Sequence, residues 1–97
     1  MTPEAKRAKC AEIIGIDMRP ITRQTPLPDP LNNSNDALGL VEFLTGRGLL
    51  FKCYKEGAKV WEWMAIFQNE EVSWSAIGPN FCLSVTDAFL RANGVKI

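Results

Sequence analysis

The chain has 97 residues, of which 46% are hydrophobic and 23% are charged, as in one ordinary globular domain. Basic and acidic residues number 11 each, so the formal net charge is zero. Non-specific nucleic-acid binding normally needs a basic surplus, and the composition argues against it. So short a chain buries a modest core, and homo-oligomerisation is one way to add buried area.

The cysteines and the hydropathy pattern indicate a reducing, cytoplasmic environment. Three cysteines are an odd number and lie far apart, unlike the disulfide set of a small secreted domain. No apolar run approaches the roughly 20 residues that span a bilayer. The N-terminal MTPEAKRAKC also lacks the apolar core of a signal peptide. We therefore expect reduced thiols and no contact with a membrane.

Helical periodicity and capping residues predict three helices, at residues 2–14, 34–45 and 79–93. Thr2 is a suitable N-cap for the first helix, and Gly15 a suitable end. Ser34 or Asn35 is expected to cap the second helix. Pro79 is expected to begin the third. Residues 16–33 contain four prolines and predict an irregular loop within a single domain, 1–97, with at most a short extended piece near Met18–Arg23.

Three strands are predicted, at Leu49–Tyr54, Val60–Phe67 and Glu71–Ile77. Their short connections favour an antiparallel meander. The middle strand is apolar on both faces, which predicts cover on both sides, either by helices or by helices on one side and a subunit on the other. The expected class is α+β, with three helices around a short antiparallel three-stranded meander in an α/β/α-type sandwich.

The residues that most enzymes depend on are missing. The chain has no histidine, which removes Ser-His-Asp and Cys-His systems, and no Cys-x-x-Cys pair for zinc. Gly46-Arg47-Gly48 lacks a third glycine and precedes a strand, unlike a phosphate-binding loop. Glu62 lies mid-strand among apolar residues, where an edge-facing or paired carboxylate explains it better than catalysis. We expect a non-enzymatic protein with no metal and no cofactor.

Aromatic and basic residues of the hairpin region are the candidate binding residues. Three are tryptophans and three are basic: Trp61, Trp63, Trp74, Arg47, Lys52 and Arg91. Indole rings can stack nucleobases beside basic residues that meet phosphates, or they can anchor a protein interface. The third interpretation is that the rings form the core, because each one buries a large area beneath a helix.

Local strings resemble the phage ABA-sandwich domain family. LPDPLNNSNDALGLVEFL resembles the loop and second helix of that family, SAIGPNFCLSVTDAFLRANG its closing segment, and AKCAEIIGI its first helix. The family commonly has a Trp-rich hairpin after the first helix, where this chain has DMRPITRQTPLPDP. The resemblance implies a bacteriophage or prophage origin, an accessory role in the host bacterial cytoplasm, and helices on both faces of the sheet. It transfers no catalytic residues.

Three functions follow as hypotheses. The leading one is an inhibitor that binds a host defence protein. The second is a sponge that sequesters a nucleotide signalling molecule, with a ring stacked on the base. The third is a phage structural or assembly protein, which would oligomerise or copurify with virion components.

Overall fold

The computed structural model describes residues 1–15, 29–56 and 62–97 of the chain. In chain order its elements are α1 (Pro3–Ile14), α2 (Ser34–Thr45), β1 (Leu50–Glu56), β2 (Glu62–Gln68), β3 (Ser73–Gly78) and α3 (Phe81–Ala92). Three helices and a three-stranded antiparallel sheet confirm the α+β class. The extended piece predicted near Met18–Arg23, and Trp61, lie outside the described residues. No helix in the described part of the chain is long and apolar enough to cross a membrane.

The predicted ends of α1 are confirmed. The Thr2 hydroxyl accepts a hydrogen bond from the backbone N–H of Ala5 at 3.1 Å, as an N-cap does. Gly15 ends the helix with a φ of 86°, in the left-handed region that a side chain disfavours. Lys6 then ties α1 to the C-terminal helix, because its Nζ lies 2.7 Å from the Asp87 carboxylate.

The N-cap of α2 and the start of α3 differ from the prediction. Asn33, rather than Ser34 or Asn35, caps α2, because its side-chain oxygen accepts from the first free backbone N–H groups of the helix at 2.9 and 3.3 Å. In α3 the N-cap is Asn80 rather than the predicted start at Pro79, and its side chain accepts at 2.9 Å. An extended asparagine just before each helix supplies the acceptor that the helix lacks.

The sheet has the order β1-β2-β3, so β2 is central and both outer strands are edges. Directly paired residues form rows that run across the three strands. One row joins Phe51, Phe67 and Trp74, and the next on the same face passes through Ala65. Phe67 and Ala65 are fully buried, so this is the face that the helices cover.

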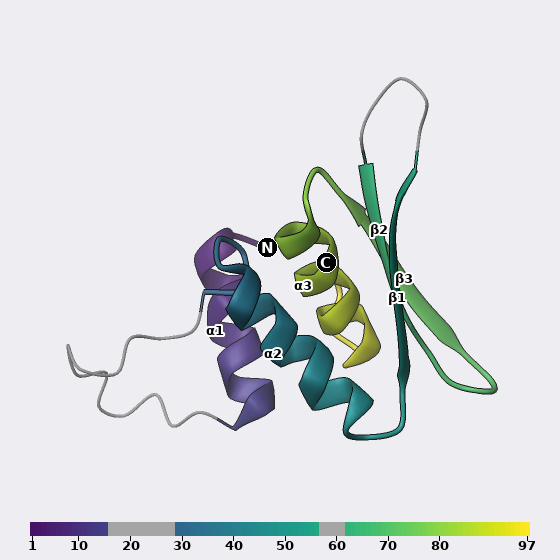
Figure 1. Ribbon diagram of the computed structural model, residues 1–97. Coiled ribbons are helices and arrows are strands. Elements are labelled where there is room, and N and C mark those ends of the chain that lie inside the picture. The colour runs from purple at the N-terminus through teal and green to yellow at the C-terminus, as the bar shows by residue number, and fades with distance from the viewer. Residues whose placement is uncertain (16–28, 57–61) are drawn as a thin grey trace.

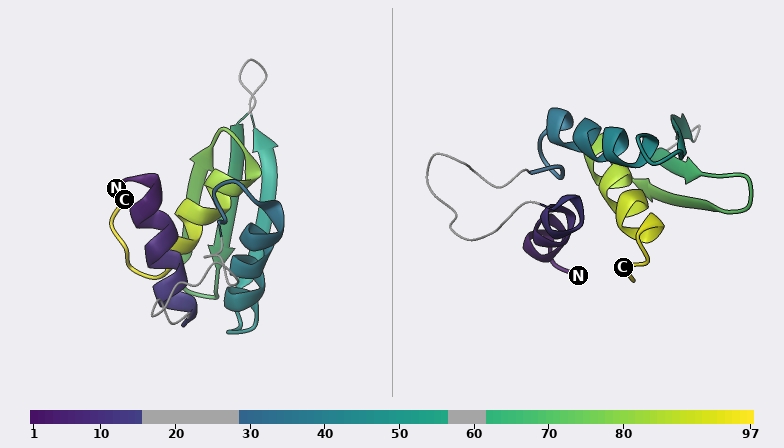
Figure 2. Two further views of the ribbon diagram at one scale, coloured as in Figure 1. Left: turned by 90° about the vertical axis from the view of Figure 1, so that its left-hand side faces the viewer. Right: turned by 90° about the horizontal axis from the view of Figure 1, so that it is seen from below.

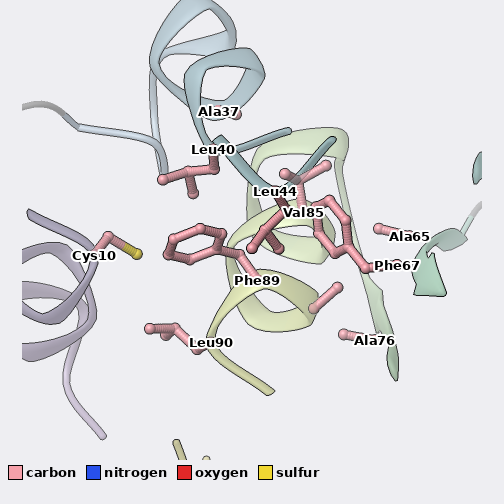
Figure 3. Close-up of a cluster of buried hydrophobic side chains, with 11 residues drawn as sticks. Cys10, Ala37, Leu40, Leu44, Ala65, Phe67, Ala76, Val85, Phe89 and Leu90 are labelled. Atoms are coloured by element: carbon pink, nitrogen blue, oxygen red, sulfur yellow. The ribbon is translucent and has the colours of Figure 1, made fainter. Parts of the chain in front are cut away.

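The helices lie in layers on that one face (Figure 1). α3 packs against β2 and β3; α1 and α2 pack against α3, and α2 also contacts β1. Two further views show the same stacking (Figure 2). Phe89 of α3 lies between Cys10 and Leu40, and Phe67 reaches toward Val85 from the sheet (Figure 3). α3 is therefore enclosed from both sides and organises the core.

The opposite face of the sheet is not covered by any helix of the described chain (Figure 1). We call it the open face; its described side chains belong to Leu50, Lys52, Tyr54, Glu62, Met64, Ile66, Gln68, Ser73, Ser75 and Ile77. Helices on both faces, the first of the two arrangements expected from the apolar middle strand, are therefore not found among the described residues. The apolar residues on the other face remain at the surface.

Candidate functional site

The two described tryptophans lie on the helix-covered face, in different rows of the sheet. Trp63 is paired with Gly78, whereas Trp74 is paired with Phe67 two rows away. The Trp63 ring meets the Phe81 ring edge-on, with centroids 6.1 Å apart. Trp63 therefore helps to pack the N-terminal end of α3, as the core interpretation expects.

The three basic candidates lie on separate surfaces. The Arg47 guanidinium sits 4.3 Å from the centre of the Phe43 ring, just after α2. Lys52 lies on the open face. Arg91 donates a hydrogen bond of 2.7 Å to the carbonyl of Ser75 on the edge strand β3. The structure does not gather these three residues around one tryptophan.

Lys55, a further basic residue of the hairpin, lies beside Trp63. Its ammonium group lies 4.8 Å from the centre of the Trp63 ring, in a cation–π contact. This contact and the Phe81 ring both engage the indole. The ring is half-buried and already has protein neighbours.

A hollow of about 410 Å³ lies between α1 and α2, and we call it the α1–α2 groove. Its floor is apolar: Cys10, Ala11 and Leu40 are buried there, and Ile14 and Phe43 are half-buried beside them. A volume of this size falls within the range of ordinary binding pockets. Side chains of a partner can enter it.

The α2 side of the groove combines acidic residues with a glycine. Asp36 and Glu42 contribute carboxylates, and Asp36 also accepts from the backbone N–H of Asp29 at 2.8 Å. Gly39 lies between them, and a Cβ built on it would meet no atom within 4 Å. A glycine inside a helix costs up to about 1 kcal/mol relative to alanine. Here it leaves room in the groove wall.

The cysteine in the groove is not a nucleophile at neutral pH. Burial raises the pKa of the Cys10 thiol from 9.0 to about 12, with the negative charge of Asp87 adding to the effect and Lys6 opposing it. Burial also raises the pKa of Cys53. Since the thiolate is the reactive form, both groups behave as small apolar side chains.

A second hollow, of about 610 Å³, lies beside the turn between β2 and β3. It is lined by Gly48, Leu50, Asn69, Glu70 and Glu71. All five of these residues are exposed. The side-chain oxygen of Asn69 already accepts hydrogen bonds from the backbone N–H groups of Glu71 and Val72, at 2.8 and 2.7 Å. Its lining is more polar than that of the α1–α2 groove.

Sequence reasoning missed the α1–α2 groove because its residues come from two helices far apart in the chain. The one available signal was Gly39, an unfavourable residue in the middle of a regular apolar stripe.

In residues 1–15, 29–56 and 62–97 no group of three or more Cys, Asp or Glu side chains is placed to hold a metal ion. The groove offers an apolar floor and negative charge.

The chain was also compared with known proteins. No protein-family model, no curated protein sequence and no solved structure matched it.

Proposed function

We propose that this protein is a non-enzymatic phage accessory protein that inhibits a host defence protein by binding an exposed segment of it in the α1–α2 groove. The observation that carries the binding step is the groove itself, with its apolar floor and acidic wall. The phage origin and the host target rest on the resemblance to the phage ABA-sandwich family.

The lining of the groove defines the chemistry of its partner. Ile14 and Phe43 offer apolar surface, so the partner segment brings apolar side chains. Asp36 and Glu42 favour a lysine or arginine next to those side chains. The expected ligand is a short segment in which apolar and basic residues alternate or adjoin.

A nucleotide sponge has less support from the same geometry. Carboxylates at Asp36 and Glu42 repel phosphate groups from the groove. The basic residues expected to meet phosphates in a sponge, Arg47, Lys52 and Arg91, are not among the groove residues. The sponge remains an alternative that a thermal-shift screen with cyclic nucleotides tests directly.

Peptide selection tests the proposed groove and does not require the host target to be identified. A displayed library of random short peptides is selected on the wild-type protein and on Gly39→Leu, which fills the groove. The expected result is enrichment of peptides with apolar and basic residues on the wild type and at least tenfold weaker binding to Gly39→Leu. Gly39→Ala is the matched control, because one methyl group meets open space and leaves most of the groove free.

The same variants then test the inhibitor role. The wild type and Gly39→Ala should retain a common host protein from bacterial lysate at comparable yield, and Gly39→Leu should lose it. Urea unfolding should show all three proteins folded, with Gly39→Ala more stable by up to about 1 kcal/mol. Peptides that bind Gly39→Leu as well as the wild type, or a selection that enriches no motif, would overturn the proposed site.

A further inference from the structure

An apolar strip crosses the open face of the sheet. Tyr54, Met64 and Ile77 are directly paired across the three strands, so their side chains form one row. Tyr54 is 41% exposed and Ile77 is 53% exposed. The Tyr54 hydroxyl donates to the Met64 sulfur at 3.1 Å, which holds the row together. These three side chains give the open face a continuous apolar strip that a partner could cover.

Charges of opposite sign flank this strip. Lys52 stands one row to one side of it, in the row of Ile66 and Ser75. Glu62 stands one row to the other side, where its partner in the register is Glu56. Along the strand direction, the open face therefore runs from positive charge through an apolar strip to negative charge.

We infer that a second copy of this chain covers the open face, through a two-fold axis that lies along the apolar strip. Such an axis keeps each strand over its counterpart and reverses the order of the rows. Lys52 of one copy, on β1, then lies in the row that faces Glu62 of the other, one strand to the side of Glu62 itself, and the same pair forms again by symmetry. The strips of the two copies stack at about 10 Å, the usual spacing of packed sheets.

The edges of the sheet are less suited to self-association than its open face. On β3, Arg91 already donates to the Ser75 carbonyl of the edge. On β1, Lys52 and Lys55 are the type of residue that discourages the addition of another strand. Stacking of faces uses the apolar strip and leaves both edges as they are.

The size of the face sets the strength of the dimer. Three strands about 4.8 Å apart and 6–7 residues long give a footprint of roughly 300 Å². The two copies together bury roughly 600 Å², about half of what the smallest stable specific interfaces bury, so we expect a weak dimer that dissociates at hundreds of micromolar. The concentration series must span that range.

A charge swap tests the pairing. Lys52→Glu and Glu62→Lys should each weaken self-association at least tenfold in sedimentation equilibrium, because each homodimer then opposes like charges at both contacts. An equimolar mixture of the two variants should dimerise again, because both contacts become attractive. Lys96→Glu is the matched control, since it makes the same charge change at an exposed residue outside this face.

Ile77→Lys tests the strip itself, and its exposure means that the core is unaffected. This variant should be folded and monomeric. A wild type that stays monomeric to about 1 mM, the limit of weak binding, overturns the inference. A dimer whose dissociation constant is unchanged by either charge substitution also overturns the inference. So does an equimolar mixture of the two variants that fails to dimerise. The Gly39 variants should dimerise as the wild type does, so a failure here is distinct from a failure of the groove.

Discussion

The interior around α3 and the open face of the sheet are built from the same strands but differ in their environment. On β2, Ala65 and Phe67 are fully buried beneath α3, whereas Met64 and Ile66, their neighbours in the chain, are only half-buried. The strand is apolar on both faces, but helices cover one of them (Figure 1). Apolar sequence therefore has two separate uses here: one set of residues stabilises the fold, and the other is available for binding.

The largest expected effect comes from truncating the covered face. Phe67→Ala removes a wholly buried ring that packs against Phe51, with centroids 5.1 Å apart, and should lower the free energy of unfolding by about 3–5 kcal/mol. A domain of this size has a total of roughly 5–15 kcal/mol, so the variant is expected to be barely folded. Urea denaturation measures the loss.

Ile66→Ala is the matched change one residue away, on the open face. Ile66 is half-buried, so its truncation should cost about 1 kcal/mol when measured on dilute protein. Equal losses for the two variants would mean that both faces are equally enclosed. That result would contradict the contrast between the interior and the open face.

Much of the fold was predictable because local signals agree with tertiary packing. The bounds of α2 match the prediction of 34–45, since its apolar stripe, flanking polar residues and glycine end coincide. The N-cap of α2 and the start of α3 were missed by one or two residues, because several adjacent polar residues can cap a helix and only the backbone geometry selects Asn33 and Asn80.

The candidate site was less predictable, because it depends on which surfaces meet. Alternation on β2 separated Ala65 and Phe67 from Met64 and Ile66, but it could not show which set a helix covers. The relative positions of Trp63 and Trp74 follow from the register of β2 and β3. Cys10 and Gly39 line one groove only because α1 packs beside α2.

The free energy of unfolding should depend on pH through Cys10, which lies in the interior. Below pH 9 the Cys10 thiol is protonated in both the folded and the unfolded chain. Above it the unfolded chain releases the proton, whereas the raised pKa of about 12 keeps the folded thiol protonated. Cys10 should therefore lower the free energy of unfolding by about 1.4 kcal/mol per pH unit within this window.

Cys10→Ala removes this titration and isolates its contribution. Chemical unfolding of the two proteins from pH 8 to about 11 should show the free energy of unfolding falling more steeply with pH for the wild type. The difference in slope should correspond to about one proton released on unfolding. The alanine variant will be less stable at neutral pH, so the slopes and not the absolute values are compared. Parallel slopes would show that the thiol is solvated in the folded protein, contrary to its burial.

The smallest expected effect is a gain in stability from a polar group in the interior. Thr86 of α3 is fully buried, and its hydroxyl oxygen has no hydrogen-bond partner among the described residues. A buried hydroxyl without a partner loses its bond to water and gains none in return. Thr86→Val replaces that hydroxyl with a methyl group of similar size and should raise the free energy of unfolding by about 1 kcal/mol.

Ser84 provides the comparison on the same helix. It is equally buried, but its hydroxyl lies 3.0 Å from the carbonyl oxygens of both Asn80 and Phe81. Ser84→Ala should therefore lower stability, by about 0.5–1.5 kcal/mol. If the two substitutions change the free energy of unfolding in opposite directions, the interior around α3 tolerates a hydroxyl only where a backbone carbonyl oxygen accepts its hydrogen bond. A loss for Thr86→Val would instead mean that this hydroxyl has a partner in the folded protein.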